Sequence, residues 1–400
     1  MPAISLSSNT YAGKKYAEYL TPALLSPKGI AQRKIVTPIE GIKNSLKMLG
    51  VDLTLELKTP SALFSSQSGQ VTRNEKELAL VPYELQIEID YEILRTTWES
   101  EMLKKGSMND YLGTPELANF IMSRLIVPKL QIANEQLYIL GKTGVTGVAS
   151  ATFSGTYNGL LADYEADASV RKYGLPSTAL KALTGITTAN PGVITVASTS
   201  DINVGDTVTY YGTNGDQQIA GTTIVGQSVV VVSKTATTLT TNKQVTGASA
   251  ATSGFIGYVN AGNVISVLSY VYGLVEDRIR MKPDTKILFG SDVEKAYRLA
   301  GATVATGDGN YFRNGYFGSL DLIPFLDMKC ESMPYWKPNT IGVWNPDNVF
   351  LGMDLMSDDV NAKVTWLGDV TNDMVYRIRN RNKTGVEYKH SDEILYVRPA

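Results

Sequence analysis

The 400-residue sequence predicts a mixed α+β fold that carries an inserted small all-β domain. Three observations lead to this class. Runs of alternating apolar and polar residues indicate strands near both ends of the chain, and residues 114–140 carry apolar side chains at helical spacing. Between residues 187 and 254 the composition changes sharply. A chain of this length also has room for two or three domains.

Residues 1–50 are predicted to form an extended arm with one short helical piece. Pro22, Pro27 and Pro38 interrupt any long helix, and the apolar residues follow no sustained period. A segment of this kind has little core of its own. We therefore expect the arm to pack on something outside itself.

Residues 51–94 are predicted to form a long β-hairpin. Residues 53–58 and 84–93 alternate apolar and polar side chains, as strands with one buried face do. The polar connection between them is far longer than a usual hairpin loop, so we expect it to lie on a neighbouring molecule. An unstructured surface loop is the alternative. The residues expected at this subunit interface are Ser65, Gln67, Gly69, Gln70, Arg73 and Lys76.

Residues 95–141 contain the clearest helix, predicted over residues 114–140. Thr114 suits the N-cap, and Pro115 suits the first helical position, where a missing N–H costs nothing. Gly141 is a natural stop, and Pro128 predicts a kink near the middle. Such a helix would be about 40 Å long, which suits a spine running through a domain.

Residues 187–256 are predicted to form the inserted all-β domain. Thr, Val, Gly, Ser and Ala dominate this stretch, charges are few, and short strand-like runs alternate with turns. Asn214-Gly215 is a strong signal for a tight hairpin turn. The exposed Thr and Ser positions suit a surface knob, but they identify no ligand.

After the insertion, helices and strands are predicted to follow one another. Residues 263–276 and 291–300 have helical patterns, and residues 286–289 form a buried type of strand. Ser291 and Glu294 have the spacing of a capping box. Residues 340–400 alternate strands and turns, with separate strands expected at residues 374–379 and 385–388. We expect residues 385–388 and 394–397 to pair around a turn at His390.

The composition disfavours catalysis and predicts no enzyme. The chain has one His and one Cys, too few for a zinc site, and a nucleophile–His pair would have to use His390. We interpret His390 as a turn residue and Cys330 as structural, and we expect no metal and no cofactor. The formal charge of −2 includes no basic stripe, and we see no membrane span and no secretory signal. A single Cys fits a reducing cytoplasm.

The order of these parts resembles the major capsid proteins of tailed bacteriophages, which have the Hong Kong 97-like fold. The resemblance covers roughly residues 50–186 and 260–400. Residues 134–141, Asn-Glu-Gln-Leu-Tyr-Ile-Leu-Gly, and residues 157–161, Tyr-Asn-Gly-Leu-Leu, are similar to the end of the family's long helix and the turn after it. Residues 286–299 are similar to its strand and helix, and residues 308–324 to the loop and strand that follow.

This resemblance implies a division of the chain into named parts. They are an N-terminal arm (1–50), an E-loop hairpin (51–94), a P-domain with a spine helix (95–141), an A-domain (142–186 and 257–330), the inserted β-domain (187–256), and the P-domain's C-terminal strands (331–400). It also implies the function of a structural subunit that self-assembles into the icosahedral capsid around a double-stranded DNA genome. Localisation would be the virion capsid, after assembly in the host cytoplasm.

The implied partners are copies of the chain itself, in hexamers and pentamers. A portal, separate scaffolding or decoration proteins, and weak non-specific contact with packaged DNA are also implied, and no membrane. Three other functions stay open from the residues. They are an encapsulin-like cellular compartment, a hydrolase that uses carboxylates, and a surface adhesin that binds through the inserted domain.

Overall fold

A computed structural model describes residues 8–12, 30–31, 33–54, 70–90, 126–143, 157–211, 217–219, 222–247, 253–304, 324–333, 335–354, 361–366 and 375–399. The chain forms two compact units. The first contains Met1–Asp163 and Asp347–His390, and the second contains Tyr164–Pro346 and Ser391–Ala400. Because the chain enters the second unit, returns to the first and ends in the second, each unit is built from segments distant in sequence.

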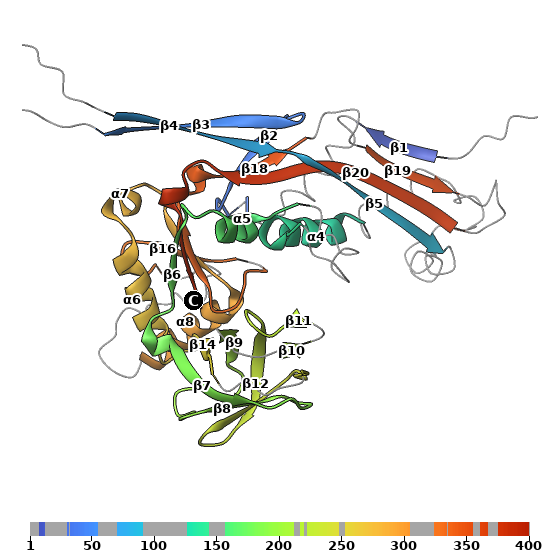
Figure 1. Ribbon diagram of the computed structural model, residues 1–400. Coiled ribbons are helices and arrows are strands. Elements are labelled where there is room, and N and C mark those ends of the chain that lie inside the picture. Colours follow the sequence, from blue (N-terminus) through green and yellow to red (C-terminus); the bar gives the residue numbers. More distant parts are fainter. Residues whose placement is uncertain are drawn as a thin grey trace, which may run out of the picture. The chain divides into compact units, whose positions relative to one another are not determined.

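The first unit contains a six-stranded sheet and a separate two-stranded hairpin (Figure 1). The strands of the sheet are β1 (Ser8–Ala12), β2 (Thr37–Glu40), β5 (Val81–Asp90), β18 (Val349–Met353), β19 (Asn361–Trp366) and β20 (Val375–Tyr388). One edge of the long strand β20 pairs with β5 over ten positions. Its other edge pairs first with β19 and then with β18. Two described parts of the predicted arm are strands of this sheet: β1 joins β19, and β2 joins β18 in parallel.

Helix α4 (Val127–Leu140) covers one face of this sheet (Figure 1). On that face, buried β20 side chains alternate along the strand with exposed ones. Four successive buried residues include three polar ones: Ile378, Asn380, Asn382 and Thr384. Polar groups meet on this face: Tyr83 of β5 donates to Asn134 of α4 at 2.8 Å. The hydroxyls of Tyr157 and Thr384 also lie 3.0 Å apart. The helix is therefore held to the sheet by hydrogen bonds as well as by apolar packing.

The described helix covers the C-terminal half of the predicted spine. Thr114 and Pro115 lie outside the described residues, and Pro128 falls in the first turn of α4. The stop at Gly141 is confirmed: its N–H donates to the Leu137 carbonyl at 3.0 Å. Gly159 then passes so close that a Cβ on it would lie 2.6 Å from the same oxygen, and only glycine permits this approach. α5 (Leu160–Ala166) begins at the next residue.

The hairpin of the first unit is formed by β3 (Ser45–Thr54) and β4 (Gln70–Ala79), paired from Ser45↔Ala79 to Thr54↔Gln70. The prediction that residues 53–58 pair with residues 84–93 is wrong, since the second run is β5 and pairs with β20. The true partner, β4, was missed because its residues show no alternation of apolar and polar side chains. A strand with this few apolar residues gives no such signal.

The second unit is built on a five-stranded sheet with the order β16-β15-β17-β21-β6. Its strands are β6 (Arg171–Gly174), β15 (Lys286–Phe289), β16 (Lys329–Ser332), β17 (Ile341–Trp344) and β21 (Leu395–Arg398). Its helices are α6 (Val264–Leu274), α7 (Asp277–Arg280) and α8 (Ser291–Val304), with 3-10 turns at Ser177–Ala179, Pro346–Asn348 and Ser391–Glu393. α6, α8 and this sheet share one apolar core, which includes Leu268, Val293 and Ile341.

Two predictions about this unit need correction. β21 pairs with β17 and β6, so the predicted pairing of residues 385–388 with 394–397 is wrong, and residues 391–400 belong to a different unit from residues 347–390. At the start of α8, Glu294 N–H donates to the Gly290 carbonyl. The cap therefore lies one residue earlier than predicted, and the Glu294 carboxylate instead accepts from Arg298 at 2.9 Å.

The inserted all-β domain is a closed six-stranded barrel with the order β12-β13-β8-β7-β14-β9. Its strands are β7 (Leu180–Ile186), β8 (Val193–Val196), β9 (Thr207–Tyr211), β12 (Ser228–Lys234), β13 (Thr238–Thr241) and β14 (Phe255–Tyr258), beside a small hairpin of β10 (Gln218–Ile219) and β11 (Thr222–Thr223). The barrel thus extends beyond both ends of the predicted range, 187–256. Asn214 and Gly215 lie outside the described residues.

A buried asparagine fastens the barrel to the rest of the second unit. Asn339 is fully buried, and its amide group donates to the carbonyl of Thr207 at 3.0 Å and the hydroxyl of Thr209 at 3.0 Å. Its side-chain oxygen accepts from Val259 N–H at 2.8 Å, and its own N–H donates to Asp292 of α8 at 2.6 Å. One residue therefore joins barrel strand β9, the end of β14 and helix α8.

Candidate assembly interface

The base of the β3–β4 hairpin is clamped to the sheet of the first unit. Gly352 of β18 and Gly385 of β20 are directly paired and leave a notch without side chains. The chain between β4 and β5 occupies this notch. A Cβ on Gly352 would lie 2.8 Å from Leu80, and one on Gly385 would collide with the backbone oxygen of Ala79. A small apolar cluster at the base consists of Ile42, Met48, Leu78 and Leu80.

A second contact of the clamp comes from Lys76. Its ammonium nitrogen lies 3.4 Å from the centroid of the Tyr388 ring and 3.7 Å from the Glu387 carboxylate, both on β20. Cation–π contacts at partly exposed sites contribute about 0.5–1 kcal/mol. The hairpin therefore leaves the sheet in a fixed direction.

At its base and just beyond it, the hairpin, a two-stranded ribbon, exposes apolar side chains: Leu46 pairs with Leu78 of the base cluster, and Leu49 pairs with Glu75. Leu46 is 37% exposed and Leu49 is 45% exposed. Lys47 and Glu75 form a cross-strand ion pair at 2.7 Å on the same stretch. In the part of the chain that the structure describes, β3 and β4 pair only with each other. The ribbon therefore carries apolar area that its own subunit leaves uncovered.

The predicted interface residues have different positions relative to this ribbon. Lys76 packs on its own subunit, as described above. Gln70 and Arg73 belong to β4, where their backbones pair with β3. Three others fall in the connection outside the described residues: Ser65, Gln67 and Gly69. The contact of these six residues with a neighbouring subunit stays a prediction.

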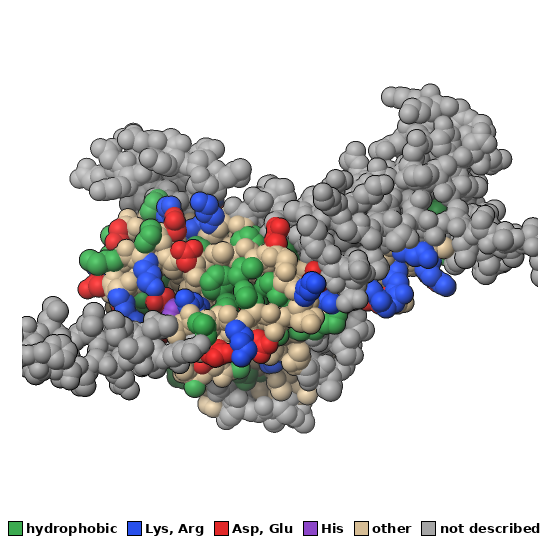
Figure 2. Space-filling model, turned by 90° about the horizontal axis from the view of Figure 1, so that it is seen from above, with side chains coloured by type: hydrophobic (Ala, Val, Ile, Leu, Met, Phe, Trp, Pro, Cys, Tyr) green, Lys and Arg blue, Asp and Glu red, His purple; other side chains and the backbone are tan. Residues whose placement is uncertain are grey.

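The exposed face of the six-stranded sheet carries a row of basic side chains. They occupy every second position of β20, and Figure 2 shows Lys and Arg gathered along this stretch: Arg377, Arg379, Arg381 and Lys383. Lys363 of β19 lies directly opposite Arg379. Glu84 accepts from both Arg379 and Arg381, which lowers the pKa of its carboxyl to about 2. Glu88 accepts from Arg377 at 2.9 Å.

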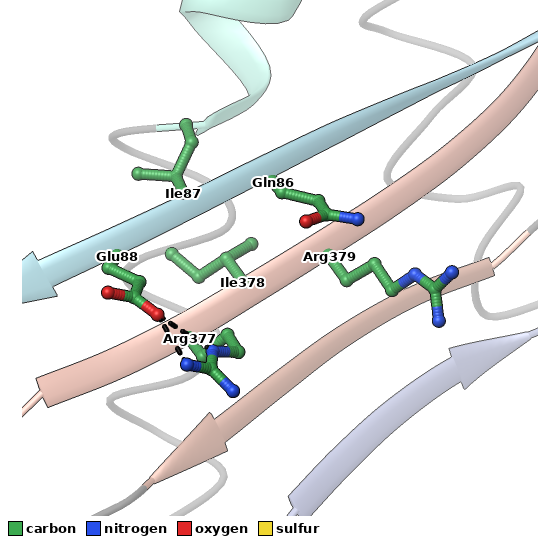
Figure 3. A pocket seen from close by; sticks show the side chains of 6 residues that line it. All are labelled: Gln86, Ile87, Glu88, Arg377, Ile378 and Arg379. Carbon is green, nitrogen blue, oxygen red and sulfur yellow. Dashed lines mark hydrogen bonds and ion pairs between the residues drawn. The ribbon is translucent and has the colours of Figure 1, made fainter.

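A shallow groove of about 540 Å³ lies at this row of basic side chains. Its described lining consists of Gln86, Ile87, Glu88, Arg377, Ile378 and Arg379 (Figure 3). Figure 3 shows Glu88 directed at Arg377, while Arg379 points away from Glu88. Basic side chains outnumber carboxylates among the described residues of this face, so these residues attract anionic groups. Such contacts weaken as the salt concentration is raised.

The one histidine and the one cysteine of the chain both lie among the described residues. His390 lies in a turn, where its N–H donates to Asn348 at 2.7 Å. Cys330 is buried in β16, and burial raises the pKa of its thiol to about 12, so the reactive thiolate is not formed at neutral pH. Among the described residues no group of three or more His, Cys, Asp or Glu side chains could hold a metal ion. No described helix has the length and apolar character to cross a membrane.

The clamp was missed at the sequence level, although a signal was present. Gly352 and Gly385 each lie within a strand, where glycine is unfavourable unless another backbone approaches closely. Reading both glycines in that way would have placed a crossing segment over β18 and β20. The partner segment could not have been identified, because nothing in residues 78–80 marks it.

No protein-family model and no curated protein sequence matches the chain. Several solved capsid structures do. The satellite phage P4 procapsid including size determination (Sid) protein aligns at 12% identity over 96% of this chain and 99% of that chain, with a TM-score of 0.47. The chain resembles phage capsid proteins. The capsid of Myoviridae phage XM1 aligns at 7% identity over 92% of this chain and 90% of that chain, with a TM-score of 0.44. A virus-like particle from Pyrococcus furiosus aligns at 8% identity over 96% of this chain and 99% of that chain, with a TM-score of 0.41. Such likenesses concern the fold and not the function.

Proposed function

We propose that this protein is the major capsid protein of a tailed phage. Copies of the chain assemble, as hexamers and pentamers, into an icosahedral shell around a double-stranded DNA genome. The observation that carries the proposal is the clamped β3–β4 ribbon. Its role is to bind the neighbouring subunit and not to complete the fold of its own.

The ribbon needs an external surface for physical reasons. Ten residues per strand span about 34 Å, yet a two-stranded ribbon alone is marginally stable in water. Its base is fixed by the Gly352–Gly385 notch and by Lys76. Leu46 at this base and Leu49 just beyond it are left exposed. Covering them on an identical copy would bury apolar area at each of many repeated contacts.

The N-terminal segment supports the same role. β1 and β2 join the sheet of the first unit through main-chain pairing with β19 and β18. Pairing of this kind needs only a free sheet edge, so identical copies can exchange such a strand at low cost. A chain that adds strands to edges and projects a ribbon is suited to a closed assembly.

The decisive experiment replaces residues 49–75, the ribbon beyond its base, by Asn-Gly. Because Met48 and Lys76 are directly paired, a two-residue turn closes the ladder and leaves the clamp and the buried Leu78 intact. We expect a soluble, folded protein that forms no shells in negative-stain electron microscopy, while the full chain forms them.

The matched control replaces residues 49–75 by a Gly/Ser segment of the same length. This segment has the original length but none of the original side chains, so it separates the effect of length from the effect of side-chain chemistry. Normal particles from the Asn-Gly variant would refute the proposal. Wild-type shells that enclose protein cargo and no genome would favour the compartment alternative.

A further inference from the structure

Helix α4 meets the six-stranded sheet through a layer of polar side chains, which we call the polar seam. Its six members come from β5, α4, the segment before α5, and β20: Tyr83, Asn134, Tyr138, Tyr157, Asn382 and Thr384. All six are buried, with at most 7% of any residue exposed. Burying a polar group is costly unless it is hydrogen-bonded, so the seam is stable only if its donors and acceptors have partners.

Two direct contacts already join members of the seam. Tyr83 donates to the side-chain oxygen of Asn134 at 2.8 Å, and the hydroxyls of Tyr157 and Thr384 lie 3.0 Å apart. Asn382 pairs directly with Tyr83 across the β5–β20 ladder, so both side chains lie on the same face of the sheet. These contacts use the oxygen of Asn134 and leave its side-chain nitrogen, Nδ2.

Two buried polar atoms of the seam have no hydrogen-bond partner among the described residues. They are Nδ2 of Asn134 and the hydroxyl of Tyr138, and both residues are fully buried. The two residues are four positions apart on α4, so they project from the same face of the helix. Leaving a buried donor unpaired costs more than a typical intramolecular hydrogen bond gains. Two such atoms side by side therefore indicate that something else bonds them.

Other oxygens of the seam lie close to the Tyr138 hydroxyl. Burial raises the pKa of Tyr138 well above its ordinary value, and the neighbouring Tyr83 and Tyr157 raise this pKa further. Thr384 is close enough to lower the same pKa, yet no described atom is in hydrogen-bonding geometry with the Tyr138 hydroxyl. This hydroxyl thus lies near oxygens that it does not bond directly, an arrangement that a small bridging molecule would complete.

The chemistry of the seam favours water as the bridging molecule. Asn134 offers N–H donors, which a cation cannot use. None of the six residues is basic, and the charge of Glu135 acts on Tyr138, so an anion would be buried without a counter-charge at high cost. Water, by contrast, is neutral and both donates and accepts, and buried waters typically make about three hydrogen bonds.

We propose that the polar seam binds an internal water molecule that accepts from Nδ2 of Asn134 and from the Tyr138 hydroxyl and donates to another hydroxyl of the seam. The acceptor is available because a hydroxyl oxygen has two lone pairs. The bound water completes the hydrogen bonds between α4 and the sheet. The completed seam favours one position of the helix, since a shift along the helix axis would separate Asn134 from Tyr83.

This inference goes beyond the proposed function, because it concerns the interior of the first unit and holds for the unassembled chain and for a shell alike. The first test is a crystal or cryo-electron microscopy map of the full-length chain that resolves ordered water. We expect a peak about 2.5–3.2 Å from both Nδ2 of Asn134 and the Tyr138 oxygen. Well-ordered side chains without such a peak, or a direct bond from Tyr138 to Thr384 in its place, would overturn the inference.

The second test is Tyr138→Phe, which removes the hydroxyl and keeps the ring. If water bonds this hydroxyl, its loss should raise the unfolding equilibrium constant of the unassembled chain about fivefold, the usual effect of losing one hydrogen bond. Urea unfolding measures this change. A variant as stable as the wild type, or more stable, would mean that the hydroxyl was unpaired, and the inference would then be wrong.

The matched control is Tyr335→Phe, which removes a hydroxyl from a residue that is 36% exposed. Its unfolding constant should stay within about twofold of wild type, as is usual for surface substitutions. An equal loss of stability in the control would contradict the inference, because the effect would then come from the exchange of Tyr for Phe and not from a buried hydrogen bond.

Discussion

The barrel and the β3–β4 hairpin are both built from antiparallel strands, but they satisfy those strands in opposite ways. The barrel closes on itself, and fifteen buried side chains fill its interior, among them Ile194, Tyr210 and Leu239. The hairpin is open on both edges, and its apolar cluster of four buried residues lies at its base. A closed barrel needs no neighbour to complete its hydrogen bonds, whereas an open ribbon does.

This difference separates stability from assembly within one chain. Changes inside the barrel should alter its folding and leave the assembly contacts of the first unit intact. Changes at the base of the hairpin should alter assembly more than folding. Three substitutions test that division, from the largest expected effect to the smallest.

Leu239→Ala should have the largest effect on stability. Leu239 is fully buried in the barrel core, and removing its side chain leaves a cavity that costs about 2–5 kcal/mol. Hydrogen exchange should speed up in the barrel strands and stay unchanged in β20. Val232→Ala, at an exposed barrel position, is the control and should change exchange little. Equal loosening of β20 would mean that the barrel is not an independent core.

Gly385→Ala should come next. The new Cβ would collide with the backbone oxygen of Ala79, so the hairpin base must shift, at a cost of about 1–3 kcal/mol. We expect fewer and malformed shells from a chain that still folds, measured by electron microscopy and circular dichroism. Gly273→Ala is the control, because no atom lies within 4 Å of its new Cβ. Normal shells from Gly385→Ala would show that the notch does not control the ribbon.

Glu84→Gln should have the smallest effect, below about 1 kcal/mol, because its ion pairs with Arg379 and Arg381 stay partly exposed. The folded pKa of about 2 lies below the ordinary 4.5, so the charged carboxylate stabilises the fold above pH 4.5. That stabilisation is lost as the pH falls toward 2. Urea unfolding of wild type and variant should therefore differ at pH 7 and converge near pH 2. A difference that does not depend on pH would point to packing instead.

The sequence predicted elements with strong periodicity and missed those without it. The buried strand at residues 286–289, the helix after it and the stop at Gly141 were all found, because apolar spacing and glycine mark them directly. The small all-β domain was found from composition, but its first strand, β7, was assigned to the host. Leu180–Ile186 precedes the change in composition, so nothing local distinguishes it.

Strand β20 shows why other elements could not be predicted from the sequence. Its two ends were predicted as separate strands, because Asn380 and Asn382 face the buried side and break the apolar alternation. The layer around these asparagines is polar: the Tyr83 hydroxyl donates to Asn134 of α4, and the Tyr157 hydroxyl lies beside Thr384 of β20. Those partners come from residues hundreds of positions away, and pairing at such distances cannot be read from local pattern. For the same reason the Gly352–Gly385 notch of the candidate interface became visible only with the fold.

The barrel enters and leaves the second unit through adjacent strands, because Leu180 of β7 pairs directly with Gly257 of β14. The residues flanking this pair, Ala179 and Val259, are buried in the host core. Because the entrance and the exit lie side by side, another domain can be inserted there without rerouting the polypeptide. Such a replacement must also supply acceptors for the buried Asn339, which now donates to Thr207 and Thr209.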